Sequence, residues 1–141
     1  VPCGEIRFEG VRFGYGREGV GVLDGLDLRI RPGERVGLVG HSGAGKSTLV
    51  NLLLGFFRPE EGRILIDGQD IAGVTQESLR AAIGVVTQEP ALLHRSIRDN
   101  IRYGRPQATE AQIRAAAERA AAHEFVLVLR DWRGREGYDA H

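Results

Sequence analysis

The sequence predicts an α/β fold in which an antiparallel β section precedes the core and a helical section follows it. Residues 5–13 and 22–30 alternate apolar and polar side chains, as half-buried strands do. Residues 35–40 and 83–88 are short apolar runs, which are typical of strands buried on both faces. From Ser96 onward, helix-start signals dominate the sequence.

The first half of the chain contains two strands, a turn and a helix. A glycine-rich turn at residues 14–21 joins the two alternating strands, and residues 31–33, Arg-Pro-Gly, end the second one. From Gly45 onward leucine residues recur at helical spacing, and Pro59 and Gly62 end this helix.

The second half alternates strand and helix before helices take over. Residues 63–68 are predicted to form a strand, and a short helix is expected around Leu79. Residues 96–99 match the S-x-x-D capping box, which opens one short helix. Residues 109–112 form a second capping box, and the helix that it opens is expected to run to about Ala122.

The composition is that of a soluble globular chain and excludes several classes of protein. The 141 residues include 19 basic and 19 acidic side chains, and 42% of the residues are apolar. This balance argues against a disordered tail and against nucleic acid as the main partner. No apolar run approaches the ~18 residues of a membrane-spanning helix, and no signal peptide is recognisable. The single cysteine, Cys3, cannot form an internal disulfide.

Residues 40–48, GHSGAGKST, match the phosphate-binding motif G-x-x-x-x-G-K-[ST] at every position. The motif follows a predicted strand and opens a predicted helix, where backbone N–H groups and the helix N-terminus can hold a pyrophosphate. Lys46 is expected to reach the β- and γ-phosphates, Ser47 to ligate Mg²⁺ and Thr48 to lie near the α-phosphate. The predicted nucleotide-binding residues of the loop are Gly40, Ser42, Gly43, Ala44, Gly45, Lys46, Ser47 and Thr48. The sequence therefore predicts a P-loop NTPase core.

Lys46 is the single lysine among the 19 basic residues, and it stands where the wide fork of arginine would not replace a compact ammonium. The alternative, a glycine-rich turn that carries a lysine by chance, is weaker because both flanks fit the motif. Residues 70–73 and 131–134 match the D-x-x-G of GTPases, but the guanine-reading N-K-x-D would need a second lysine. Residues 14–19 match G-x-G-x-x-G, but no helix signal follows them.

Two long segments, the first of which contains this loop, resemble the nucleotide-binding domain of ATP-binding cassette (ABC) transporters. The resemblance is strongest to exporters in which membrane and nucleotide domains are fused. Residues 22–71 run in register with the core of that family, and residues 79–101 resemble the stretch that holds its Q-loop. The resemblance extends from Ile6 to about Phe125 and again over residues 137–141, and it implies ATP and Mg²⁺ as ligands.

The resemblance adds two candidate ligands outside the phosphate loop. Tyr15 lies in a stretch similar to the family's aromatic loop, where a tyrosine stacks on adenine; the alternative is a surface tyrosine on a turn. Gln88 matches the Q-loop glutamine, which contacts Mg²⁺ in the family, so that Ser47 and Gln88 are the predicted metal ligands. The alternative for Gln88 is a polar residue that ends a strand.

Several motifs of the family are missing from the chain. The LSGGQ signature, the Walker B strand with its general base and the switch histidine are absent, so no catalytic residue is assigned. The chain also starts at Val1 without an initiator methionine. We therefore expect a truncated ABC ATPase domain, its N-terminal part, with too little buried surface to be stable alone.

This comparison divides the chain into three expected parts. They are an antiparallel β section with the aromatic loop, about 1–34; a P-loop core to the Q-loop, 35–92; and the start of a helical subdomain, 93–141. Residues 126–136 are less regular than in the family, and packing is the default expectation for Trp132 within them.

The expected function is ATP binding and, in an intact dimeric parent, ATP hydrolysis that powers transmembrane export. The implied partners are a second nucleotide-binding domain, arranged head to tail, and a membrane domain fused upstream, at the cytoplasmic face of the membrane; no nucleic acid is expected. The alternatives are the ATPase module of a non-transport ABC protein, of the DNA-repair or translation type, and a P-loop scaffold without activity.

Overall fold

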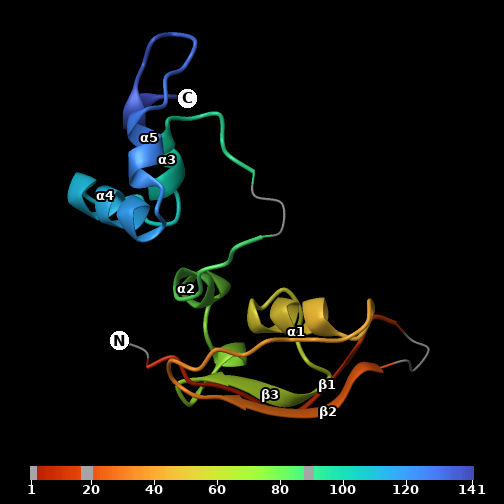
Figure 1. The fold of residues 1–141 in the computed structure, drawn as a ribbon. Coiled ribbons are helices and arrows are strands. Elements are labelled where there is room, and N and C mark those ends of the chain that lie inside the picture. The colour runs from red at the N-terminus through yellow and green to blue at the C-terminus, as the bar shows by residue number, and fades with distance from the viewer. Residues whose placement is uncertain (1–2, 17–20, 88–90) are drawn as a thin grey trace. The chain divides into compact units, whose positions relative to one another are not determined.

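The computed structural model describes residues 3–16, 21–87 and 91–141. By its contacts the chain forms two compact units, Val1–Gly84 and Val85–His141, which are described separately here. Figure 1 shows the sheet in the first unit and the cluster of short helices in the second.

The first unit contains a four-stranded antiparallel sheet with the order β2-β1-β3-β4. Its strands are β1 (Ile6–Gly14), β2 (Gly21–Ile30), β3 (Glu61–Ile66) and β4 (Gln69–Asp70). The central strand β1 pairs with both β2 and β3, so that Phe8 lies opposite Leu28 on one side and Ile64 on the other. The antiparallel β section and the strand predicted at 63–68 are thereby confirmed.

A β-bulge in β1 places its apolar side chains on one face. Gly10 adopts φ 57°, the pairing register with β2 shifts between Phe8 and Val11, and the Gly10 N–H donates to Asp27 Oδ1 at 2.8 Å. The inserted residue offsets the strict alternation of a strand, because Phe8 and Val11 would otherwise face opposite sides. Phe8, Val11 and Phe13 are consequently all buried.

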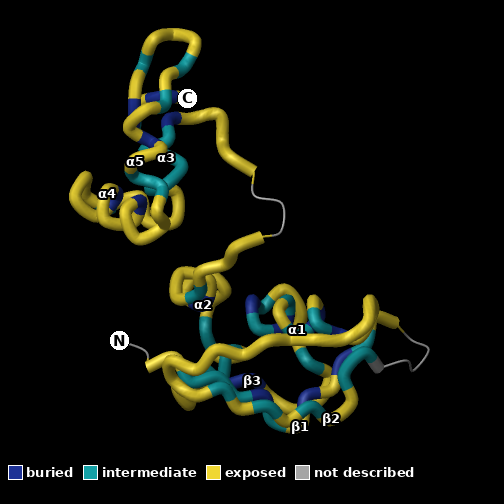
Figure 2. The backbone as a smooth tube through the Cα atoms, viewed as in Figure 1, coloured by how far each residue is buried: buried dark blue, intermediate teal, exposed yellow. Residues whose placement is uncertain are grey.

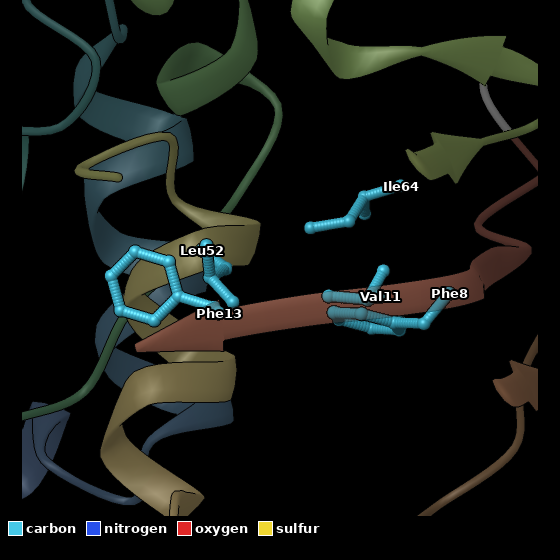
Figure 3. Packing of buried hydrophobic residues seen from close by; sticks show 5 residues of the cluster. All are labelled: Phe8, Val11, Phe13, Leu52 and Ile64. Atoms are coloured by element: carbon cyan, nitrogen blue, oxygen red, sulfur yellow. The ribbon is translucent and has the colours of Figure 1, made fainter. Parts of the chain in front are cut away.

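Helix α1 (Lys46–Leu53) packs onto this face of the sheet and completes the core of the first unit. Leu52 from α1 joins Phe8, Val11, Phe13 and Ile64 in one cluster, as Figure 3 shows. Leu49 and Leu53 pack against the same cluster, which confirms the helical spacing of the leucines after Gly45. The helix ends at Leu53, before the predicted stop at Pro59.

A 3₁₀ turn and a short α-helix follow the sheet. The 3₁₀ turn η1 (Ile71–Gly73) leads to α2 (Gln76–Ala81), whose N-terminus is capped by Thr75 through a 3.2 Å bond from the Ser78 N–H. Arg80 of α2 lies over the Phe56 ring at 4.6 Å and donates to the Leu54 carbonyl at the end of α1. These contacts fix α2 against the C-terminal end of α1.

The second unit consists of α3 (Ile97–Arg102), α4 (Glu110–Arg119), α5 (His123–Leu127) and the 3₁₀ turn η2 (Gly137–Asp139). The predicted capping box at 109–112 is present, since Thr109 and Gln112 bond reciprocally. At 96–99 Ser96 Oγ caps the helix by accepting from the Asp99 N–H, but the Asp99 carboxylate bonds the Ser96 hydroxyl rather than its N–H, so the reciprocal bond of the box is replaced. Helix α4 ends at Arg119 rather than Ala122, because Ala121 adopts a positive φ of 53°. The small core of this unit contains Ile113, Ala117, Val126 and Ala140.

Two predicted strands do not form. Residues 35–40 and 83–87 have no strand structure and are mostly exposed along the chain (Figure 2). Within them the Val39 and Val86 side chains are 94% and 97% exposed. An apolar run becomes a doubly buried strand only where strands flank it and helices cover both faces. In the described part of the chain the sheet is purely antiparallel, and neither run pairs with it.

Trp132 also differs from its expectation. Its side chain is 83% exposed rather than packed, and the Arg133 guanidinium lies over its ring at 4.4 Å. One face of the indole ring is therefore covered by a cation. Such a cation–π contact is favourable because indole is the best aromatic partner for a cation. Within the described ranges, no helix is long and apolar enough to cross a membrane.

Candidate functional site

The backbone of the phosphate loop adopts the conformation that its glycines permit. Gly43 and Gly45 have φ values of 84° and 81°, a region that residues with a Cβ rarely enter. The Ala44 N–H donates to the His41 carbonyl at 3.1 Å, which closes a turn inside the loop. Helix α1 starts directly after Gly45, where the Leu49 N–H donates to the Gly45 carbonyl at 2.9 Å.

The N-terminus of α1 has no side chain that competes with an anion. Gly45 is its N-cap and supplies no capping hydrogen bond, and no acidic residue lies in the first turn. The first N–H groups of a helix lack partners within it and carry partial positive charge. This helix end can therefore accept phosphate oxygens.

Lys46 reaches back across the loop that precedes it. Its ammonium donates to the carbonyl oxygens of Gly40 and His41, both at 2.6 Å. An ammonium has three donors, so two carbonyl bonds leave one donor for an anion above the loop. The loop itself thus holds the single lysine where a phosphate on the α1 terminus would meet it.

The two hydroxyls that follow Lys46 lie in different environments. Ser47 is exposed on the first turn of α1, whereas Thr48 is buried and its Oγ1 lies 3.1 Å from the Tyr15 hydroxyl. Ser47 is therefore accessible to a ligand, and Thr48 is engaged with the residue that the sequence assigns to the base.

Tyr15 is held by an aromatic cluster that we define as Phe13, Tyr15 and Phe57. The Tyr15 ring lies 5.0 Å from Phe13 and 5.4 Å from Phe57, in T-shaped geometry at 87° and 89°. The sequence analysis did not identify Phe57; the signal available was the pair Phe56-Phe57 directly after α1. Tyr15 remains 57% exposed, so part of its surface is free for a ligand.

The loop packs closely against β2 at Gly45. A Cβ added at this position would lie 3.0 Å from Val22 Cγ1 and 3.1 Å from Leu23 Cδ2. Both the positive φ and this close approach require glycine, which explains in physical terms why glycine stands at this position of the motif. The antiparallel β section thus positions the loop as well as Tyr15.

The first unit therefore brings together most of the predicted ligands. Tyr15 and the residues of the loop lie in one unit, whereas Gln88 falls outside the described residues. No group of three or more His, Cys, Asp or Glu side chains in the described ranges could form a metal cage.

The two D-x-x-G segments have structural roles. Asp70 accepts from the Ala72 N–H at 2.8 Å and caps η1. Asp131 accepts from the N–H groups of Arg133 and Arg135 at 2.8 and 3.0 Å and from Arg135 Nε at 2.7 Å. Burial alone raises the pKa of the Asp131 carboxyl, but these hydrogen bonds outweigh it and lower the pKa to about 2.

The fold and the loop together define a nucleotide-binding protein of the P-loop class. The family model described as "ABC transporter" matches residues 23–131. The chain belongs to the ABC transporter family.

Three comparisons illustrate the similarity. An uncharacterized ABC transporter ATP-binding protein of Haemophilus influenzae is 56% identical over the whole chain, which spans 23% of that relative. An ATM1-type heavy metal exporter of Novosphingobium aromaticivorans is 50% identical over 95% of the chain and 21% of the relative. The solved structure of a bacterial Atm1-family ABC exporter with ATP bound has a TM-score of 0.84 at 49% identity, over 97% of this chain and 23% of the other.

The chain thus spans about a quarter of the length of the relatives it matches. The similarity in structure confirms the predicted fold class, a P-loop core preceded by an antiparallel β section and followed by helices.

Proposed function

We propose that this chain is the ATP-holding part of the ATPase domain of an exporter. The observation that carries the proposal is the Lys46 ammonium, which the Gly40 and His41 carbonyls hold beside the uncapped N-terminus of α1. Relatives named as exporters share about half of the residues of the chain. One of these names, the ATM1-type heavy metal exporter, supports transport as the role of the longer protein.

Within this proposal each residue has a distinct task. The N–H groups of the loop from Gly40 to Gly45 and the Lys46 ammonium bind the phosphates, and Tyr15 binds the adenine ring. Ser47, together with Gln88, would hold Mg²⁺, which neutralises charge on the phosphates when bound. Thr48 supports the loop through its bond to Tyr15 and lies near the α-phosphate.

Hydrolysis is proposed to need residues that this chain does not carry. In the family the signature motif comes from a second nucleotide-binding domain, and the general base follows a Walker B strand; neither sequence is present here. We infer a head-to-tail dimer of such domains, fused to a membrane domain, at the cytoplasmic face of the membrane. The chain alone is expected to bind ATP weakly and to turn over none.

Equilibrium titration of the chain with ATP and Mg²⁺ tests the binding proposal. Lys46→Ala should weaken ATP binding by at least tenfold, because a charge-assisted contact to phosphate contributes roughly 1.5–3 kcal/mol. Lys46→Arg should also weaken it, because a wide planar guanidinium does not replace the compact ammonium that donates to both carbonyls. Unchanged affinity in Lys46→Ala would contradict ATP binding at this loop.

Turnover is tested separately with the same chain. ATPase activity should be absent from the 141 residues and present in the longer protein. Activity of the chain that disappears in Lys46→Ala would contradict the proposed need for a second domain.

A further inference from the structure

The aromatic cluster of Phe13, Tyr15 and Phe57 joins three separate parts of the first unit. Phe13 is a buried residue of β1, Tyr15 follows that strand directly, and Phe57 follows α1. The Phe13 and Phe57 rings also contact each other, at 5.4 Å between centroids. All three rings therefore touch, which defines one position for the Tyr15 ring.

Two kinds of contact hold Tyr15 from different sides. Its ring packs in T-shaped geometry on Phe13 and Phe57, while its hydroxyl bonds Thr48 in the first turn of α1. The hydroxyl bond constrains the tip of the side chain, and the ring contacts constrain its plane. Phe13 belongs to the core, so Phe57 is the partner that can be changed without opening the core.

We propose that Phe57 is a positioning residue for the nucleotide base, because it holds the Tyr15 ring in the orientation that receives adenine. This inference rests on the proposed ATP binding. An exposed side chain on a turn loses rotamer freedom when a ligand orders it, and this loss weakens binding. Phe57 and Thr48 impose that order beforehand, so the base binds a ring that is already in place.

This role predicts a selective effect on the base rather than on the phosphates. Phe57 contacts neither Lys46 nor the loop glycines among the described interactions, and its nearest functional contact is the Tyr15 ring. Loss of the Phe57 ring should therefore weaken ligands that contain adenine and leave ligands that contain only phosphate unchanged.

Phe56 offers a matched control at the neighbouring position. It is an exposed phenylalanine of the same segment, but it lies under Arg80 at 4.6 Å and takes no part in the aromatic cluster. Phe56→Ala removes the same number of atoms as Phe57→Ala. A general effect of lost apolar surface would appear in both variants.

The experiment compares two probes, ATP with Mg²⁺ and inorganic tripolyphosphate with Mg²⁺, in equilibrium titrations of the intact protein. Phe57→Ala should raise the Kd for ATP by about 3- to 10-fold, the cost of ordering one side chain. The Kd for tripolyphosphate should stay within twofold in this variant. Phe57→Tyr should bind ATP as the unchanged protein does, because it keeps the aromatic ring. Phe56→Ala should also have the Kd for ATP of the unchanged protein.

Three results would overturn the inference: equal loss for both probes, no loss for either, or an equal loss in Phe56→Ala. Phe57→Leu keeps most of the apolar volume and serves if Phe57→Ala does not fold; it should show the same selective loss. Lys46→Ala separates the two proposals. If this variant leaves the Kd for both ATP and tripolyphosphate unchanged, the proposed phosphate site itself is contradicted. A strong Lys46→Ala effect without a selective Phe57 effect contradicts only the positioning role.

Discussion

The hydroxyl groups of Tyr15 and Thr48 lie 3.1 Å apart and join the end of β1 to the first turn of α1. Thr48 is buried, so removal of the Tyr15 hydroxyl would leave a buried polar atom without this partner. Tyr15→Phe should lower the free energy of unfolding of the first unit by about 1 kcal/mol. Hydrogen exchange of the α1 and β1 amides measures this change.

The same variant separates the two functions of Tyr15. The ring and its contacts with Phe13 and Phe57 persist in Tyr15→Phe, so ATP affinity should change by less than about threefold. Tyr15→Ala removes the ring and should reduce ATP affinity by tenfold or more. Equal effects of the two substitutions would show that the hydroxyl, rather than the ring, determines binding.

Gly62 and Gly68 provide a second pair of predictions. Both have a φ of 80°, but an added Cβ at Gly62 collides with the carbonyl oxygens of Glu9 and Gly10, whereas at Gly68 it meets nothing within 4 Å. Gly68→Ala should cost only the strain of the left-handed backbone, about 1–2 kcal/mol. Gly62→Ala should cost clearly more, because the β1–β3 pairing must shift.

Chemical denaturation monitored by circular dichroism checks this difference. A similar loss of stability in the two variants would mean that β3 moves away from β1 without cost at residues 9–10. That result would contradict the tight packing that the register between β1 and β3 requires.

The features that the sequence predicted well are those that depend on neighbours in the chain. The Thr109–Gln112 capping box and the alternation of 22–30 are local patterns, and both form as expected. The phosphate loop belongs to this group as well, because Gly43 and Gly45 encode its backbone directly. Local chemistry therefore predicted the backbone conformation of the loop at Gly43 and Gly45.

The features that were missed depend on contacts between distant residues. The runs 35–40 and 83–87 have the composition of central strands, but a strand exists only where another strand accepts its hydrogen bonds. Phe57 escaped notice because its role depends on Tyr15, which lies 42 positions earlier in the chain. A periodic pattern cannot report a pairing of that kind.

Leu52 packs α1 against the sheet, and its truncation should lower the free energy of unfolding of the first unit. Leu52→Ala is expected to cost about 2–5 kcal/mol, because the side chain is fully buried against Phe8, Val11 and Ile64. Val50→Ala, on the exposed side of the same helix, should cost less than about 0.5 kcal/mol. Urea denaturation measures both, and equal values would contradict the burial of Leu52.

The pKa of the Asp131 carboxyl group should lie well below the ordinary range of an aspartate. Its pKa of about 2 lies below the ordinary value of 3.8, since the N–H groups of Arg133 and Arg135 and the Arg135 guanidinium stabilise the charged form despite burial. A lowered pKa in the folded state means that the stability from this group is present above about pH 4 and is lost as the pH falls toward 2.

Carbon-13 NMR of the Asp131 carboxyl should accordingly show a titration midpoint near 2. Asp131→Asn should remove the acid-dependent loss of order in residues 131–135 and lower the thermal stability of the second unit at pH 7, because the amide offers one acceptor oxygen in place of two. Asp139→Asn is the control, since that exposed carboxylate pairs with Arg98 and not with the loop 131–135 among the described interactions, so the loop should stay unchanged. A midpoint at or above 3.8 for Asp131 would contradict the hydrogen-bonded arrangement, because burial without these donors would raise the pKa of the carboxyl group.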